Sequence, residues 1–295
     1  MMVKNKVHES FITGLMSSQG MGRYKIIRRL GQGGSGVVYQ ARDSYIQRQV
    51  AIKISQGISS QSRKKLFLEA QSAGRLSHPN ILAIYDTGLY RNFCYIIMEF
   101  LEGETLKAHC QKDNLLPLDR CAEIVFKICN ALDYAHQKGV IHRDIKPSNI
   151  MLDGQGEPRL MDFGIAHISE ETSEKGIWGT PSYMSPEQLR EEIITHQSDI
   201  FSLGCVLYEL LSGTRAFRGE NDFSVIYKIT RENPEAVRHL RPDLPVIFEE
   251  ILNKALAKNL EDRYASGTEF GYDLRVALRG IKLPQGDKRF EDIID

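Results

Sequence analysis

The chain has 295 residues, of which 42% are hydrophobic and 26% charged, and its 38 basic residues balance its 38 acidic ones. This composition is that of a globular protein with room for one large domain or two lobes, and its charge balance indicates neither nucleic acid nor an anionic membrane as a partner. The five cysteines form no C-x-x-C pair, which argues against zinc and disulfides and fits a reducing compartment. With no apolar run of about 18 residues and no signal peptide, the sequence predicts a cytoplasmic protein without a membrane span.

The two ends of the chain differ from its middle. Residues 1–22 show no clear periodicity, so we expect a flexible leader, with one amphipathic turn at 11–16 as the alternative. The residues from 283 onward form a polar tail. Between these ends strands come first and helices follow, which places a lobe boundary near residue 102.

The first strands enclose a glycine-rich turn. The β-prone segment 24–30 leads into Gly31–Gly36, whose backbone N–H groups can approach phosphate oxygens without side-chain clash. Dinucleotide-binding folds share such glycines but continue as a helix, whereas residues 37–41 are β-prone. A Val-Ala-Ile-Lys strand then ends on Lys53, which elsewhere would be an ordinary surface lysine.

A helix and two strands complete this part of the chain. The apolar stripe over residues 60–76 predicts a helix, with Glu69 beside the stripe as one more solvated charge or as a partner for a cation. Strands are expected at 81–85 and 93–98, separated by a turn around 88–92.

The most informative stretch is 142–149, His-Arg-Asp-Ile-Lys-Pro-Ser-Asn. It follows an expected helix over 121–138, which a glycine ends, and precedes a short apolar run. Asp144 can accept a hydroxyl proton, Lys146 can neutralise a transferring phosphoryl group, and Asn149 can ligate a hard cation. The alternative is a solvated turn with this sequence by chance.

The later motifs follow in order. The segment 158–164 is a short strand that ends on Asp162 and a Phe-Gly pair, and the polar residues 165–179 come next. The segment 199–211 is apolar nearly all round and predicts a buried helix, with Asp199 as its N-cap. Further helices are expected at 222–231, 245–258 and 267–279.

These motifs resemble those of eukaryotic-like (Hanks-type) protein kinases from Tyr24 to about Arg279. The chain has the glycine loop, the strand lysine, H-R-D-x-x-x-x-N and D-F-G in the order of that family. The strings Ser-Pro-Glu-Gln-Leu at 185–189 and Glu-Asp-Arg-Tyr-Ala-Ser at 261–266 are most similar to bacterial Ser/Thr kinases. Ser185 stands where the family more often has alanine, a mild departure.

The resemblance implies an α+β, bilobal protein-kinase fold. The domain would cover 23–280, with a small antiparallel β-sheet N-lobe carrying one helix (23–101) and a larger, mainly helical C-lobe (102–280). The leader 1–22 and the polar tail 281–295 would lie outside it.

The resemblance also assigns chemistry to four residues. Asp144 would orient the substrate hydroxyl and accept its proton, and Lys146 would neutralise charge on the transferring phosphoryl group. Lys53, held by Glu69, would contact the α and β phosphates of ATP.

The implied cofactors are ATP and Mg²⁺, with Mn²⁺ as an alternative. Asn149 and Asp162 would hold the metal. Met98 would flank the adenine pocket, although it is equally suited to plain core packing. The residues implied to contact ATP are Leu30, Gly31, Gly33, Gly36, Val38, Ala51, Lys53, Met98, Glu99, Leu101 and Met151.

The implied substrates are Ser/Thr hydroxyls of proteins, because Lys146 and Thr180 follow the Ser/Thr rather than the tyrosine kinase pattern. Arg143 before the catalytic Asp is typical of kinases whose activation loop orders around a phosphate. We expect autophosphorylation at Thr172 or Ser173, with the phosphate paired to Arg143 and helped by His167. A loop that orders without phosphate is the alternative, and a homodimer that autophosphorylates in trans is left open.

Two structural roles complete the resemblance. Asp199 would brace the catalytic-loop backbone, which is compatible with an N-cap role, and Arg263 would pair with Glu187.

Three other functions fit less well. A pseudokinase scaffold predicts loss of Lys53, Asp144 or Asp162, and all three are present. A small-molecule kinase of the aminoglycoside type generally lacks the Pro-Glu segment. A dinucleotide-binding oxidoreductase is disfavoured by the strand that follows the glycine loop.

Overall fold

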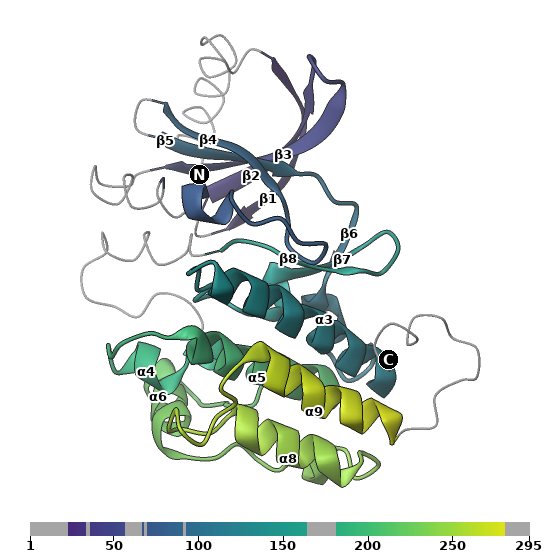
Figure 1. Ribbon diagram of the computed structural model, residues 1–295, viewed down its shortest axis with the longest axis vertical. Coiled ribbons are helices and arrows are strands. Elements are labelled where there is room, and N and C mark those ends of the chain that lie inside the picture. Colours follow the sequence, from purple (N-terminus) through teal and green to yellow (C-terminus); the bar gives the residue numbers. More distant parts are fainter. Residues whose placement is uncertain are drawn as a thin grey trace. The chain divides into compact units, whose positions relative to one another are not determined.

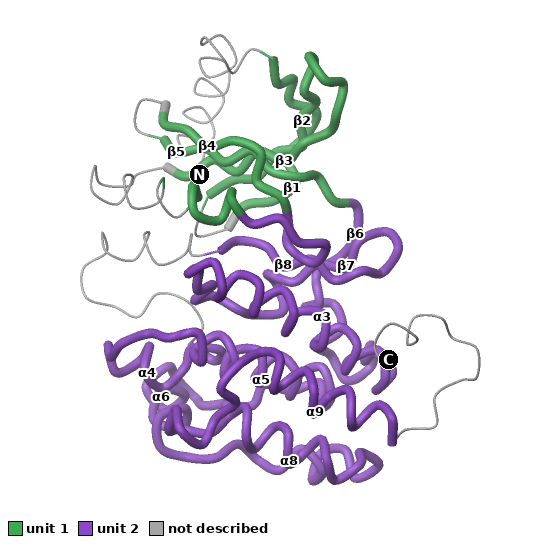
Figure 2. The backbone as a smooth tube through the Cα atoms, in the orientation of Figure 1, with its two compact units in different colours: residues 1–75, 83–101, 165–174 green, residues 76–82, 102–164, 175–295 purple. Residues whose placement is uncertain are grey.

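The computed structural model describes residues 23–33, 36–56, 67, 70–90, 93–163 and 181–280. Two compact units make up the chain and are coloured separately in Figure 2. Unit 1 comprises residues 1–75, 83–101 and 165–174, and unit 2 comprises residues 76–82, 102–164 and 175–295.

Unit 1 is built on a five-stranded antiparallel sheet with the order β1-β2-β3-β5-β4 (Figure 1). Successive side chains point to opposite faces of the sheet, and both faces are buried along β3 and along most of β5. One face buries a core that includes Tyr24, Tyr39, Ile52 and Ile97. The strands are β1 (Tyr24–Gly33), β2 (Gly36–Asp43), β3 (Arg48–Gln56), β4 (Ile84–Tyr90) and β5 (Phe93–Glu99).

The strand expected at 81–85 is placed differently in the structure. β4 begins at Ile84 and runs to Tyr90. The prediction that Gly88 belongs to a turn at 88–92 was therefore wrong. Gly88 pairs with Tyr95 in the sheet, and a Cβ at Gly88 would collide with the Tyr95 ring. Glycine therefore marks a close approach here rather than a turn. Leu82 is bound elsewhere, because its N–H donates to the Leu160 carbonyl.

The helix expected over 60–76 lies largely outside the described residues. Residue 67 and residues 70–73 of this stretch are helical. Ala70, Ala73 and Leu76 are buried, as the apolar stripe predicted.

Unit 2 is mainly helical. The long helix α3 packs against α5 and α9, and α8 packs against both α5 and α9 (Figure 1). α5 is buried along almost its whole length, as its apolar sequence predicted, because neighbouring helices cover it. The helices are α3 (Leu118–Gln137), α4 (Pro186–Leu189), α5 (His196–Ser212), α6 (Asp222–Arg231), α7 (Val237–Leu240), α8 (Val246–Ala255) and α9 (Gly267–Arg279), with 3₁₀ turns η1 (Leu106–His109), η2 (Pro147–Asn149) and η3 (Pro181–Tyr183).

A small antiparallel sheet with the order β6-β7-β8 also belongs to unit 2. Its strands are β6 (Gly103–Thr105), β7 (Ile150–Asp153) and β8 (Pro158–Leu160). β7 covers the short apolar run that follows the 142–149 stretch, and β8 confirms a short strand within 158–164 but ends at Leu160, two residues before Asp162. Val140 and Ile141, which precede the stretch, lie outside any strand.

Two sequence expectations concern cysteines and membranes. All five cysteines are buried thiols, and burial raises the pKa of Cys94 to about 11 and that of Cys121 to about 12. Within the described residues, no helix has the length and apolar character needed to cross a bilayer.

Candidate active site

The stretch 142–149 is a loop suspended between α3 and β7. α3 ends where Gly139 adopts φ 74°, a left-handed conformation that favours glycine, and this ending confirms the predicted stop. The loop then passes over the N-terminal part of α5. Its side chains are thus carried between two rigid elements of the same unit.

Asp199 of α5 holds the loop from below. Its Oδ2 accepts the backbone N–H of His142 and its Oδ1 that of Arg143, each at 2.8 Å. His136 of α3 donates from Nε2 to Asp199 Oδ2, also at 2.8 Å. The N-cap of α5 is Thr195 rather than Asp199, so the N-cap prediction was wrong and the bracing role is the one observed. Asp199 lies inside the first turn, where its carboxylate faces the loop.

The Asp144 carboxylate is fixed by two neighbours in the loop. Lys146 Nζ lies 2.9 Å from Oδ1 and 2.7 Å from Oδ2. Asn149 donates from Nδ2 to the Asp144 carbonyl at 2.8 Å and to its Oδ2 at 2.9 Å. Asp144 and Lys146 both remain partly exposed. A carboxylate held in one orientation yet open to solvent is suited to receive a hydroxyl group.

His142 connects the loop to the segment that carries Asp162. The His142 ring is fully buried, donates from Nε2 to the Met161 carbonyl at 2.7 Å, and packs on Phe163 with 4.6 Å between ring centroids. The Met161 N–H in turn donates to the Asn149 carbonyl at 2.9 Å. Asp162 therefore follows a peptide bound directly to Asn149, and it has φ 60°, uncommon for a residue with a side chain.

These two residues fit a hard divalent cation. The Asn149 amide uses Nδ2 for both of its hydrogen bonds to Asp144, and its oxygen is then the atom suited to bind a metal. Asp162 supplies a carboxylate on the adjoining segment. Carboxylate and amide oxygens are the ligands that Mg²⁺ and Mn²⁺ accept.

In unit 1, four predicted ATP contacts share one face of the sheet. Val38 pairs with Lys53 across β2 and β3, and Ala51 pairs with Met98 across β3 and β5. Because Ala51 and Lys53 are two residues apart, all four side chains lie on the same face, opposite the Tyr39–Ile52 core. Lys53 is only 4% exposed there.

At the start of β2, next to the glycine-rich turn, Gly36 is a position that requires glycine. Gly36 adopts φ 136°, and a Cβ on it would lie 2.2 Å from the Ile54 carbonyl oxygen. Around Gly31 a Cβ would meet nothing within 4 Å, so this position has open space. Gly33, at the end of β1, pairs with Gly36.

The other predicted ATP contacts lie in both units. Leu30 is exposed on β1, while Glu99 and Leu101 are half-buried at the end of unit 1. Met151 is half-buried on β7 in unit 2. Some predicted residues lie outside the described ones: Glu69, His167, Thr172, Ser173 and Thr180.

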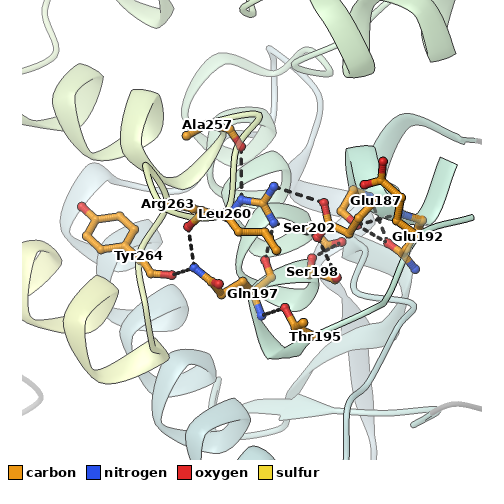
Figure 3. Close-up of polar contacts among 12 residues, drawn as sticks. Glu187, Glu192, Thr195, Gln197, Ser198, Ser202, Ala257, Leu260, Arg263 and Tyr264 are labelled. Atoms are coloured by element: carbon orange, nitrogen blue, oxygen red, sulfur yellow. Dashed lines mark hydrogen bonds and ion pairs between the residues drawn. The ribbon is translucent and has the colours of Figure 1, made fainter. Parts of the chain in front are cut away.

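Beneath the loop, a buried ion pair supports the Pro-Glu segment (Figure 3). Arg263 donates from its two terminal nitrogens to the Glu187 carboxylate, at 2.9 and 3.2 Å, and Ser198 donates to the same carboxylate at 2.7 Å. Burial alone would raise the pKa of Glu187, but the hydrogen bonds and charge of Arg263 hold this pKa below its ordinary value. The predicted Arg263–Glu187 pair is confirmed.

Comparison with known proteins identifies the family. The sequence matches the family described as "Protein kinase domain" over residues 24–269. This chain belongs to the protein kinase family. Its two units correspond to the bilobal kinase fold that the sequence predicted.

The chain is similar to curated bacterial kinases. It is 40% identical over 281 residues to "Serine/threonine-protein kinase PknB" of Mycobacterium leprae, covering 92% of this chain and 45% of the relative. It is 37% identical over 282 residues to "Serine/threonine-protein kinase PrkC" of Bacillus subtilis, covering 94% of this chain and 43% of the relative. The chain thus spans less than half the length of these relatives.

Sequence reasoning missed one contact to the kinase catalytic loop. Gln188 of α4 donates from Nε2 to the Arg143 carbonyl at 2.9 Å. The Ser-x-x-Gln spacing from Ser185 is the signature of a capping box, which the structure contains, and it marks Gln188 as a residue with a local partner. The second partner, Arg143, lies far away in sequence and only the fold brings it near.

Proposed function

We propose that this chain is a protein serine/threonine kinase that transfers the γ-phosphoryl group of ATP to Ser or Thr hydroxyls of protein substrates. The observation that carries the proposal is the fixed Asp144 carboxylate, bound by Lys146 and Asn149 in a loop that Asp199 braces. The family match and the names of the similar kinases support the same activity.

In the proposed reaction Asp144 orients the substrate hydroxyl and accepts its proton as the oxygen attacks the γ-phosphorus, while the bond from this phosphorus to the β–γ bridging oxygen breaks and ADP leaves. Lys146 neutralises the charge that develops on the transferring phosphoryl group, and Lys53 binds the nucleotide phosphates. Asn149 and Asp162 would hold Mg²⁺, with Mn²⁺ as an alternative, and the metal supplies charge neutralisation on the phosphates when bound. Positioning and electrostatics thus provide most of the catalysis.

The test compares the purified chain with an Asp144→Asn variant. Each is incubated with γ-labelled ATP and Mg²⁺, alone and with a generic basic protein substrate, and ATP affinity is measured separately. Label on Ser or Thr in the wild type, absent from the variant, supports the proposal. ATP binding without any transfer in the wild type favours the scaffold alternative, and the absence of ATP binding contradicts the proposed chemistry.

A regulatory step accompanies the proposed activity. We infer that Thr172 or Ser173 is autophosphorylated and that the phosphate pairs with Arg143, helped by His167. Phosphopeptide mapping beside a Thr172→Ala/Ser173→Ala variant tests it, because full activity in that variant would contradict it. A rate of self-labelling per molecule that rises with protein concentration would support a homodimer that acts in trans.

We propose a kinase domain at 23–280, with an N-lobe at 23–101 and a C-lobe at 102–280, a leader at 1–22 and a tail at 281–295. Five buried thiols fit the reducing cytoplasm, and fractionation of cells that produce the chain would test that location.

A further inference from the structure

Gln188 joins two segments that the proposed reaction uses. Its Oε1 accepts the backbone N–H of Ser185 at 2.9 Å and the Ser185 hydroxyl at 3.1 Å. Its Nε2 donates to the Arg143 carbonyl at 2.9 Å. Ser185 begins α4 in the Ser-Pro-Glu segment, and Arg143 immediately precedes Asp144. One side chain therefore bridges this segment and the catalytic loop.

The orientation of the amide follows from its partners. A backbone N–H can only donate and a carbonyl can only accept, so Oε1 must face Ser185 and Nε2 must face Arg143. A carboxylate at this position would satisfy Ser185 equally well, since Glu and Gln both complete a capping box. Only an amide also satisfies Arg143. The choice of glutamine is thus explained by the catalytic loop rather than by the helix cap.

The carbonyl that Gln188 binds belongs to Arg143, a residue with an unusual backbone conformation. Arg143 has φ 67°, a conformation that side-chain-bearing residues adopt rarely because it is strained. Such a conformation persists only where the surroundings over-determine it. Here Asp199 holds the Arg143 N–H at 2.8 Å while Gln188 holds its carbonyl.

The same peptide unit continues into Asp144. Its carbonyl oxygen accepts from Gln188 and its N–H, on Asp144, donates to His142 Nδ1 at 3.2 Å. The plane of this peptide is therefore held at both ends. The plane and the φ angle of Asp144 together set the direction of the Asp144 Cα–Cβ bond, so a tilt of this plane displaces the carboxylate.

We propose that Gln188 is a positioning residue for phosphoryl transfer, which holds the Arg143–Asp144 peptide in the orientation that aims the Asp144 carboxylate. The inference rests on the proposed kinase function. Gln188 connects the Ser-Pro-Glu segment to the catalytic loop, so a displacement of this segment would also displace Asp144. A misplacement of about 1 Å at a reacting group can cost about 100-fold in rate.

The test compares Gln188→Glu with Ser185→Ala in the full chain. Gln188→Glu keeps an acceptor for Ser185 but loses the donor to Arg143, whereas Ser185→Ala loses the capping hydroxyl and keeps the contacts of the amide to the Ser185 N–H and the Arg143 carbonyl. We expect Gln188→Glu to lower kcat at least about 10-fold with KM for ATP within about twofold of wild type. Ser185→Ala should lower the thermal midpoint and leave kcat near wild type.

Two further readouts separate positioning from general destabilisation. The carboxyl introduced by Gln188→Glu can donate to Arg143 only when protonated, so the ratio of variant to wild-type kcat should rise as pH falls from 8 to 6. Amide hydrogen exchange across 142–149 should be faster in Gln188→Glu and unchanged in Ser185→Ala.

The outcomes are distinct. A wild-type kcat in Gln188→Glu, or parallel losses of kcat and thermal midpoint in both variants, overturns the inference. If the wild-type chain transfers no label at all, the proposed function has failed, and the exchange measurement alone then decides whether Gln188 holds this loop.

Discussion

The carboxylate of Asp199 and the backbone N–H of Arg143 lie 2.8 Å apart, which ties the most buried helix of unit 2 to the residue before Asp144. Asp199 is 1% exposed and also binds His142 and His136. A buried carboxylate with three donors around it is well satisfied, so its position is rigid. Because Asp199 binds two backbone N–H groups of the catalytic loop, this part of the loop is also held in place.

Replacing Asp199 by Asn should therefore impair catalysis more than nucleotide binding. The amide keeps the size of the carboxylate but has one acceptor oxygen in place of two, so it must leave His142 or Arg143 without its acceptor. We expect kcat to fall about 100-fold, with ATP affinity within about threefold of wild type. Steady-state kinetics and ATP titration measure the two effects. The control is Asp222→Asn in the exposed first turn of α6, which should match wild type; an unchanged kcat in Asp199→Asn would contradict the bracing role.

Lys146→Met should remove charge from beside the Asp144 carboxylate without unfolding the domain. Lys146 Nζ is 2.7 Å from Asp144 Oδ2 and its side chain is partly exposed, so its loss costs little stability. Its charge would matter in the transition state, and we expect kcat to fall about 100-fold with a thermal midpoint within about 2 °C of wild type. Lys112→Met, at an exposed site, is the matched control. A kcat within twofold of wild type would exclude a role for Lys146 in the chemistry.

Arg263→Met should destabilise the protein strongly. The substitution leaves the Glu187 carboxylate buried with Ser198 as its remaining side-chain donor, at a cost of about 3–5 kcal/mol. For a domain of this size that corresponds to a fall in Tm of about 10 °C. Calorimetry or circular dichroism at pH 7.5 measures it.

The loss in Arg263→Met should also depend on pH. In the wild type the pKa of Glu187 lies below its unfolded value, so the pair contributes stability above that value and loses it only as pH falls through the folded pKa. Without Arg263, burial raises the pKa of Glu187, and stability then falls as pH rises. The difference in Tm between wild type and variant should be larger at pH 7.5 than at pH 5. The double variant Arg263→Met/Glu187→Gln should remove this pH dependence, and an equal difference at both pH values would refute the pairing argument.

Lys258→Met should stabilise the protein at neutral pH. The Lys258 ammonium is buried near the Phe217 ring, 4.1 Å from its centroid, and it has no hydrogen-bond partner among the described residues. Burial lowers the pKa of Lys258 to about 8, below its unfolded value. The charged form therefore costs stability below pH 8, and stability rises as pH increases from 8 toward 10.5.

The expected gain in Tm for Lys258→Met is about 2–4 °C at pH 7. Removing the buried charge stabilises the fold, and the lost cation–π attraction offsets part of this gain. The gain should shrink steadily as pH rises from 8 to 10, since the folded lysine is then neutral and the unfolded lysine approaches its own pKa of 10.5. Lys254→Met, which breaks a half-exposed pair with Glu269, is the control and should give no gain at either pH. A gain that is equal at both pH values would show that charge is not its cause.

The sequence by itself determined the family, the order of the helices and strands, and the residues whose side chains could take part in a reaction. Asp144, Lys146 and Asn149 lie close together in the chain, so the loop that holds them makes their contacts almost unavoidable. The buried helix α5 was predictable because it is apolar on every side. These features depend on local spacing and on composition, which a sequence displays directly.

Only the tertiary structure decided which distant partners fix that loop. Asp199 suited a helix cap by sequence, yet Thr195 caps α5 and Asp199 braces the loop. Gly88 suited a turn, yet it lies inside β4, where the Tyr95 ring fills the space that a Cβ would need. Gln188 had a predictable capping partner but an unpredictable second one in Arg143. Each of these outcomes depends on which surfaces pack together. Packing brings together residues that are far apart in the chain, and the sequence shows no repeating pattern that would reveal such pairs.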